Sequence, residues 1–260
     1  MIKLVASDID GTLLPEGMKD LNPEIYDIIL ELKKNNISFI AASGRQLESQ
    51  ELLFAPIVDE ISYISENGAI CKLLGKQYVI SEFDRALAMR IIEEVEKYPN
   101  CNLTVSTPST QYIKAGNQEF HDYMSNHLRY QVTPIASFKD IHEPIVKMAF
   151  LDTVTTSASF EHFKSLFKNE IRVVTAGNLW VDFIPFTSNK GTALQFILDK
   201  LQLTADEAIC FGDQQNDIEM LDLLTNSYAM AHSKSDVQKH ATHITESVEK
   251  TLRELLKTLG

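Results

Sequence analysis

The hydrophobic pattern near the N-terminus alternates between short apolar runs and helical spacing. The run from Ile2 to Ala6 is mostly apolar and contains β-branched residues, which is typical of a buried strand. After the helix-start signal Asn22-Pro23, apolar residues recur every three to four positions, at Ile25, Ile28, Ile29 and Leu32. Residues 37–42 form a second apolar run. The order strand, helix, strand predicts a βαβ unit with two parallel strands.

The pattern changes between about residues 83 and 186, where several predicted strands follow one another between helices. This order predicts an α+β module with a largely antiparallel sheet. The expected helices span 84–97, 118–128 and 158–167, and the expected strands span 103–106, 112–114, 146–151, 172–175 and 179–184. The alternation of strands and helices returns after the module, with strands at 208–211 and 227–230 and a last helix at 248–259. We therefore expect a core made of residues 1–82 and 187–260, with a domain inserted at 83–186.

The composition of the 260-residue chain, 44% apolar and 23% charged, is that of a folded soluble protein. No apolar run approaches the roughly 20 residues that a membrane-spanning helix needs, and Asp8 and Asp10 interrupt the first apolar stretch, which argues against a signal peptide. We expect a cytoplasmic protein with reduced cysteines. The net charge of −12 argues against nucleic acid or an anionic membrane as a partner.

Polar and charged residues follow four predicted strands or open the helices after them. They are Asp8 and Asp10, Ser43, Lys190, and the group Asp213, Asn216 and Asp217. Because the carboxyl ends of parallel strands share one edge of a sheet, we expect these groups to meet. Four carboxylates in one pocket would repel one another and any phosphate, and Mg²⁺ resolves this repulsion because it takes hard oxygen ligands and bridges them to phosphate oxygens.

The remaining groups at this edge suit an anionic substrate. Lys190 supplies a compact positive charge, while the Ser43 hydroxyl and the backbone amides of the Asp8–Gly11 turn and Gly44 are hydrogen-bond donors for phosphate oxygens. Together the groups indicate a phosphoryl-transfer site.

With these motifs in this order, the sequence resembles the haloacid dehalogenase (HAD) superfamily, and within it the Cof-type sugar-phosphatase branch. The matching motifs are Asp8-Ile9-Asp10-Gly11-Thr12, Ser43-Gly44-Arg45, Lys190-Gly191-Thr192-Ala193-Leu194 and Gly212-Asp213-Gln214-Gln215-Asn216-Asp217. Glu66-Asn67-Gly68-Ala69 matches a further segment that is typical of the branch. The resemblance implies an α/β fold: a Rossmann-like, doubly wound parallel sheet core with an inserted α+β cap domain.

The resemblance also implies an activity, that of a Mg²⁺-dependent phosphatase acting on a sugar phosphate or a similar small phosphomonoester. Asp8 would be the nucleophile that forms an aspartyl-phosphate, and Asp10 the general acid and then the general base. Mg²⁺ would be held by the Asp8 carboxylate, the Asp10 backbone carbonyl and Asp213. The phosphate would be bound by Ile9 through its backbone and by Ser43, Gly44, Lys190 and Asn216, with Thr12 and Asp217 in supporting roles.

Two positions depart from this assignment. Arg45 is the last residue of the second motif, but a structural salt bridge explains it at least as well as a ligand contact does, so it is left out of the catalytic set. Where the family often has Met-Gly-Asn-Ala, this chain has Met230-Ala231-His232-Ser233, so the contact that the family makes there is in doubt.

Two alternative functions use the same opening chemistry. A receiver-type signalling domain also carries acidic residues, Mg²⁺, a phospho-aspartate and a lysine, but it needs neither Asp10 nor an insert. A phosphomutase would require a phosphorylated activator and would release little inorganic phosphate. The sequence identifies neither the phosphate ester, nor the oligomeric state, nor the residues of the insert that would choose the substrate.

Overall fold

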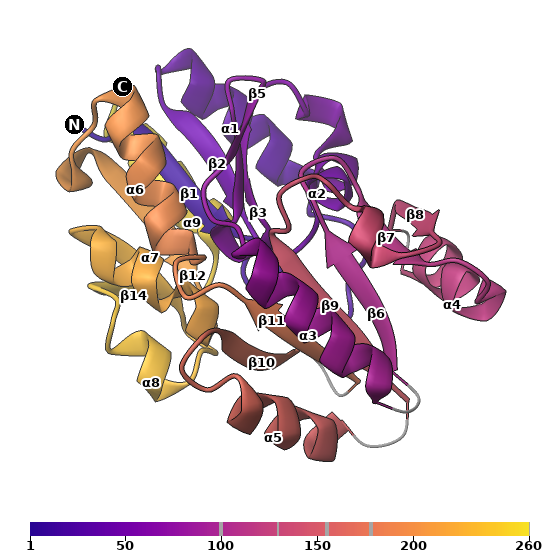
Figure 1. The fold of residues 1–260 in the computed structure, drawn as a ribbon. Helices are drawn as coiled ribbons and strands as arrows, with labels where there is room; N and C mark the ends of the chain where they lie inside the picture. The colour runs from indigo at the N-terminus through magenta and orange to yellow at the C-terminus, as the bar shows by residue number, and fades with distance from the viewer. Residues whose placement is uncertain (99–100, 129, 154–155, 177–178, 260) are drawn as a thin grey trace. The chain divides into compact units, whose positions relative to one another are not determined.

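The computed structural model describes residues 1–98, 101–128, 130–153, 156–176 and 179–259. The chain divides into two compact units (Figure 1). The core unit consists of Met1–Ile80 together with Asn189–Gly260, and the inserted unit consists of Ser81–Ser188. The segment 83–186, expected as an inserted domain, lies within the second unit.

An eight-stranded sheet forms the centre of the core unit, in the order β14-β13-β12-β1-β2-β3-β4-β5. The six strands from β14 to β3 run parallel to one another, whereas the β3–β4 and β4–β5 pairs are antiparallel. The strands are β1 (Leu4–Asp8), β2 (Ser38–Ala42), β3 (Ser62–Ser65), β4 (Ile70–Leu73), β5 (Lys76–Val79), β12 (Ala208–Gly212), β13 (Asn226–Met230) and β14 (His243–Thr245).

Successive side chains of each strand point to opposite faces of this sheet, and a hydrophobic cluster covers each face. Val5 and Phe39 belong to one hydrophobic cluster, and Leu4 and Ile40 belong to the other. The first cluster includes residues of α1 (Glu24–Lys34), α2 (Leu47–Leu53) and α9 (Val248–Lys257). The second includes residues of α6 (Lys190–Leu201), α7 (Ile218–Leu223) and α8 (Ser235–Gln238). This arrangement confirms the predicted doubly wound α/β core.

The inserted unit is built on a six-stranded sheet in the order β10-β11-β9-β6-β7-β8. Its strands are β6 (Cys101–Ser106), β7 (Gln111–Lys114), β8 (Val132–Ile135), β9 (Lys147–Asp152), β10 (Arg172–Ala176) and β11 (Trp180–Ile184). All pairs are antiparallel except β7 with β8. Residues of α3 (Arg85–Lys97) and α5 (Thr156–Leu166) share a phenylalanine-rich core with one face of the sheet. The largely antiparallel α+β character is as predicted.

Three elements differ from the expectations. The helix expected at 118–128 is α4 (Gln118–Asp122) followed by a wider π turn, Tyr123–His127. Strands β8 and β14 were not predicted. Both lie at a sheet edge, where little apolar patterning is needed; β8 contains Pro134, which edge strands tolerate, and β14 has three residues that are not buried.

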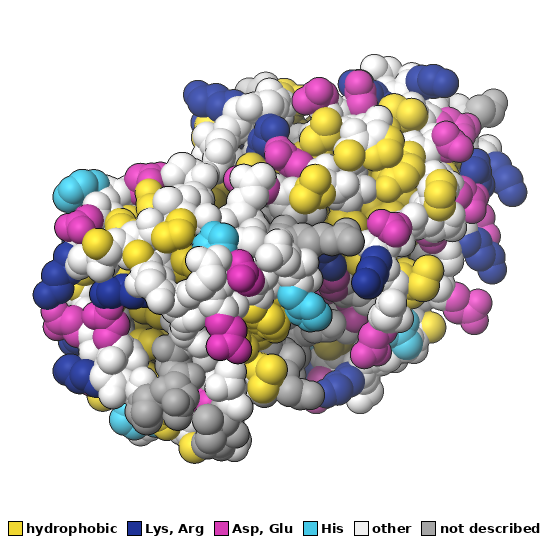
Figure 2. Space-filling model, turned by 90° about the vertical axis from the view of Figure 1, so that its right-hand side faces the viewer, with side chains coloured by type: hydrophobic (Ala, Val, Ile, Leu, Met, Phe, Trp, Pro, Cys, Tyr) yellow, Lys and Arg dark blue, Asp and Glu magenta, His cyan; other side chains and the backbone are white. Residues whose placement is uncertain are grey.

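The described residues also concern the expectations about membrane-spanning helices, cysteines and charge. None of their helices combines the length and the apolarity needed to cross a membrane. Cys71 and Cys210 are buried and free, and burial raises the pKa of the Cys71 thiol to about 12. The side chain of Cys101 lies outside the description. Acidic and basic side chains are interspersed on the face drawn in Figure 2.

Candidate active site

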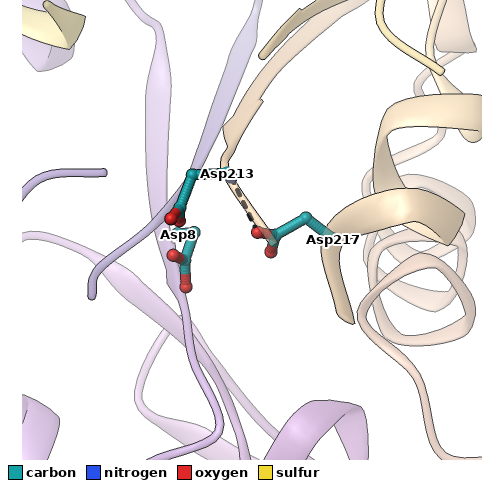
Figure 3. Close-up of side chains that lie close together, drawn as sticks. All are labelled: Asp8, Asp213 and Asp217. Carbon is teal, nitrogen blue, oxygen red and sulfur yellow. Dashed lines mark hydrogen bonds between the residues drawn. The ribbon is translucent and has the colours of Figure 1, made fainter. Parts of the chain in front are cut away.

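Three carboxylates meet at the carboxyl edge of the parallel sheet. Asp8 is the last residue of β1, and Asp213 directly follows its neighbour β12, so parallel pairing places these two side chains together. Asp217 reaches the same point from the short turn before α7. One oxygen from each of the three carboxylates lies within 4.8 Å of the others (Figure 3).

Lys190, the first residue of α6, is fully buried against this cluster. Its Nζ donates hydrogen bonds to Asp8 Oδ1 at 2.5 Å and to Asp217 Oδ1 at 2.6 Å. Burial alone would lower the pKa of Lys190, but attraction to Asp217 and Asp8 outweighs burial and raises that pKa above its usual value. Lys190 therefore stays charged and links two segments that are far apart in sequence.

Asp217 is engaged through both oxygens. Its Oδ2 accepts the backbone N–H of Asp213 at 2.9 Å (Figure 3). The same oxygen accepts the backbone N–H of Gln214 at 3.0 Å, while Oδ1 accepts from Lys190. A Cβ at Gly212 would lie 2.5 Å from the Cβ of Asp217, so a side chain there would push Asp217 away. Asp217 thus shapes the loop that carries Asp213 and holds Lys190.

Asp213 is oriented by the turn after β1. Thr12 Oγ1 donates a hydrogen bond of 3.0 Å to Asp213 Oδ1. Gly11 has a φ of +87°, and a Cβ there would lie 2.3 Å from Asp213 Oδ2, so both the backbone conformation and the available space require glycine. His232, at the position where the family pattern is broken, lies with Nε2 3.7 Å from Asp213 Oδ2.

Burial and mutual repulsion disfavour the ionised carboxylates. The pKa of Asp8 is raised well above its ordinary value, first by burial and then by repulsion from Asp217. The pKa of Asp213 is raised by burial and, to a smaller degree, by the same neighbour. With all groups ionised, three carboxylates and one ammonium leave a formal charge of −2 in this buried cluster. The donors are hard oxygens, so the site fits a divalent cation such as Mg²⁺.

Asp10 lies outside the three-carboxylate cluster and is paired with Arg45. The guanidinium donates Nε to Asp10 Oδ2 at 2.8 Å and NH2 to Oδ1 at 2.5 Å, a bidentate ion pair. The Asp10 side chain is 47% exposed. Ser43 Oγ lies 3.5 Å from Asp10 Oδ2. Sequence reasoning left Arg45 out of the site, although its place directly after Ser43-Gly44 was a usable signal.

The other predicted phosphate-binding residues lie around this edge. Ser43 follows β2, and its side chain is buried and accepts the backbone N–H of Arg45 at 3.2 Å. Asn216 donates its side-chain N–H to Asn67 Oδ1 at 3.3 Å. Ile9 packs its side chain into the core, so only its backbone is suited to a ligand. The described structure therefore brings together Asp8, Thr12, Lys190, Asp213 and Asp217, places Asp10 beside Ser43 and Arg45, and links Asn216 to Asn67.

A family model described as haloacid dehalogenase-like hydrolase matches residues 5–251. The chain belongs to this family. The match spans the core and the insert, and it confirms the resemblance that the ordered motifs indicated.

Similar proteins cover nearly the whole chain. The 5-amino-6-(5-phospho-D-ribitylamino)uracil phosphatase of Escherichia coli K12 is 25% identical over 240 residues, which is 91% of this chain and 88% of that protein. A crystal structure of a protein from Eubacterium rectale is 27% identical, with a TM-score of 0.86 over 98% of this chain and 99% of that one. A HAD subclass IIB sugar phosphatase, 20% identical, shares the fold with a TM-score of 0.76 over 97% of this chain and 98% of that one.

Proposed function

We propose that this haloacid dehalogenase-like hydrolase is a Mg²⁺-dependent phosphatase that hydrolyses a small phosphomonoester through an aspartyl-phosphate on Asp8. The observation that carries the proposal is the buried cluster of Asp8, Asp213 and Asp217, in which Lys190 donates hydrogen bonds to Asp8 and Asp217. A buried excess of negative charge is unfavourable in a purely structural role. It suits a site that binds a cation together with a phosphate group.

Asp8 is the proposed nucleophile. One carboxylate oxygen attacks phosphorus, the bond from phosphorus to the ester oxygen breaks, and the phosphoryl group passes to Asp8. Lys190, held by Asp8 and Asp217, offers its charge to the phosphoryl oxygens, and Ser43, Asn216 and the Ile9 and Gly44 amides complete the phosphate site. Asp8, Asp213 and the Asp10 backbone carbonyl would hold Mg²⁺, which when bound neutralises the charge that develops on the phosphoryl oxygens.

Asp10 is the proposed general acid and base. It gives a proton to the leaving ester oxygen, then takes a proton from the water that attacks the aspartyl-phosphate, so that inorganic phosphate and the free Asp8 carboxylate are restored. In this structure Arg45 donates to both oxygens of Asp10. Arg45 thus orients the Asp10 carboxyl group, whose remaining lone pairs stay available for the proton, and this contact makes Arg45 part of the proposed site.

The substrate that we propose is a small phosphorylated metabolite, such as a sugar phosphate. The E. coli relative is named for a phosphorylated ribitylamino-uracil, and one structural neighbour is described as a sugar phosphatase. The inserted unit would act as a cap that selects the part of the substrate beyond its phosphate. If so, rejoining the core without residues 81–188 should leave hydrolysis of p-nitrophenyl phosphate but remove discrimination between natural esters. An unchanged substrate ranking in a folded core would place specificity elsewhere.

Phosphate release across a panel of esters tests the function directly. The panel contains sugar phosphates, nucleotides, and flavin and pyridoxal phosphates, each assayed with Mg²⁺ and with excess EDTA. We expect multiple turnovers with Mg²⁺ on at least one small ester, and none with EDTA. Full activity in EDTA would contradict the metal dependence. A single burst without turnover would instead favour a phospho-aspartate signalling domain, and dependence on a phosphorylated activator would favour a phosphomutase.

A further inference from the structure

The turn between β3 and β4 has an unusual backbone. Glu66, Asn67 and Gly68 follow one another with φ values of 50°, 56° and 95°. Asparagine and glycine tolerate this left-handed region, whereas a glutamate there is strained. Three such residues in a row persist only where the surroundings determine them, and strain of this kind gathers at functional sites.

The surroundings of this turn are backbone segments of the proposed phosphate site. The N–H of Glu66 donates to the carbonyl of Arg45 at 3.1 Å, and the N–H of Asn67 donates to the carbonyl of Ser43 at 3.2 Å. A Cβ at Gly68 would lie 2.1 Å from the carbonyl oxygen of Asn189, the residue before Lys190. The turn therefore packs directly against the segments that carry Ser43 and Lys190.

The side chain of Asn67 reaches a third segment. Its Oδ1 accepts a hydrogen bond from Asn216 Nδ2 at 3.3 Å. The same oxygen would lie 2.8 Å from a Cβ at Gly44, so the Asn67 amide packs closely against the glycine of the second motif. Asn67 thus contacts Gly44 and Asn216, two residues that bind the phosphate in the proposed function.

We propose that Asn67 is a positioning residue of the phosphate site, which fixes the Asn216 amide and the Ser43-Gly44 backbone in the arrangement that binds the phosphoryl group. The inference rests on the proposed function and extends it to a residue outside the four motifs. Since the phosphoryl group is common to all substrates, the contribution of Asn67 is independent of the leaving group.

The chain contains a matched control for this inference. Asn36, just after α1, also has a left-handed backbone, with a φ of 60°, and it lies in the connection to β2 at the opposite end of that strand from Ser43. Glycine at either position keeps the left-handed backbone and removes the side chain. We therefore compare Asn67→Gly with Asn36→Gly in the full-length protein with Mg²⁺.

Both variants should keep the melting temperature of the wild type or raise it. Asn36→Gly should leave kcat and KM unchanged. Asn67→Gly should lower kcat/KM by roughly tenfold, the size of one lost pair interaction, by the same factor for activated and unactivated esters. It should weaken inhibition by inorganic phosphate by a similar factor. Wild-type kinetics and phosphate inhibition in Asn67→Gly would overturn the proposal, as would a lower melting temperature with unchanged phosphate affinity.

A double-mutant cycle with Asn216→Ala shows whether Asn67 acts through Asn216. In the Asn216→Ala background, Asn67→Gly should lower kcat/KM by a smaller factor than in the wild type, and the loss that remains measures the contact of Asn67 with Gly44. Equal losses in both backgrounds would contradict positioning through Asn216. Calorimetric titration of inorganic phosphate into the wild type and Asn67→Gly, both with Mg²⁺, needs no turnover. An inactive wild type whose phosphate affinity still depends on Asn67 would refute the phosphatase and retain the positioning role.

Discussion

In the inserted unit, Lys147 forms an ion pair with the buried Asp182, one positive charge with one negative charge. Nζ lies 3.0 Å from Oδ2, and the two residues come from β9 and β11, which are neighbours in the antiparallel sheet. In the core unit, the buried ammonium of Lys190 donates to Asp8 and Asp217, and Asp213 lies beside them, so three carboxylates from two segments meet at one edge of the parallel sheet.

The two regions show how the balance of buried charge separates structure from function. A balanced pair carries no net charge, and apolar residues of similar volume often replace such a pair without loss of stability. In the unbalanced cluster, burial and repulsion between carboxylates disfavour the ionised forms, so the pKa values of Asp8 and Asp213 are raised. Such a cluster is favourable only when a cation completes it, and perturbed carboxylates in a cluster of this kind mark a functional site.

The largest effect expected outside the three-carboxylate cluster concerns Asp10, the proposed general acid and base. Asp10→Asn should lower turnover of an unactivated sugar phosphate by about 10²–10⁴-fold, because general acid catalysis is lost. Formation of the phosphoenzyme from p-nitrophenyl phosphate, whose leaving group needs no proton, should be affected far less. Rapid-quench kinetics with both esters measure this difference. Equal losses for the two esters would contradict the role of Asp10.

A change at Arg45 should have a smaller effect on the rates with the same two esters. Arg45→Lys keeps the charge but loses the bidentate geometry, so it should affect the unactivated ester more than the activated one, by about tenfold or less. Arg253→Lys is the matched control, since Arg253 donates Nε to Glu24 at 2.7 Å on the surface of the same unit. Arg253→Lys should leave both rates unchanged.

Asp213→Asn should weaken Mg²⁺ binding but stabilise the metal-free protein. Calorimetry should show at least about 100-fold weaker Mg²⁺ binding, beyond the usual effect of residues that only support a ligand. In EDTA at pH 8, however, the variant should melt at a higher temperature than the wild type, because it removes a buried carboxylate whose pKa is raised.

The gain in melting temperature of metal-free Asp213→Asn should become smaller as the pH falls. A carboxylate whose folded pKa is raised destabilises the fold above that pKa, and the penalty disappears as pH falls toward the ordinary value of 3.8. The difference in melting temperature between Asp213→Asn and the wild type should therefore shrink as the metal-free proteins are acidified. A difference that grows with acidification would contradict the assigned shift.

The smallest effect should come from the balanced pair of the insert. Replacing both partners together, as Lys147→Met with Asp182→Leu, should leave Mg²⁺ affinity unchanged within about twofold and alter the free energy of unfolding by less than about 2 kcal/mol. The matched change in the core, Lys190→Met with Asp217→Leu, should abolish phosphate release. A large loss of Mg²⁺ affinity in the insert variant would remove the distinction between the two regions.

Much of the core could be predicted because its signals are local. The helical spacing of Ile25 and Ile28 and the apolar runs of β1 and β2 reflect burial against one sheet, and the acidic residues follow strands whose parallel order fixes where they meet. Edge strands such as β14 bury little and carried no such pattern. An Asn-Gly pair between apolar runs is a hairpin signal, and Asn67-Gly68 joins the antiparallel strands β3 and β4.

The remaining features depend on contacts between distant segments. The bidentate pairing of Arg45 with Asp10 and the engagement of both Asp217 oxygens are set by side-chain orientations that no spacing records. The left-handed φ of Glu66 arises because Arg45, Ser43 and Asn189 constrain the turn around it. The sequence of this segment matches the family branch and signals a tight turn, but neither signal gives the backbone angle of Glu66.

The most direct test of the account is to trap the phosphoryl group on the protein. The wild type, Asp8→Asn and Asp10→Asn are mixed with Mg²⁺ and a phosphate-labelled activated ester, quenched in acid within milliseconds, and digested to locate the label. The account predicts an acyl-phosphate on Asp8 in the wild type, its accumulation in Asp10→Asn, and no labelled protein or turnover in Asp8→Asn. Label on another residue, or turnover by Asp8→Asn at the wild-type rate, would contradict it.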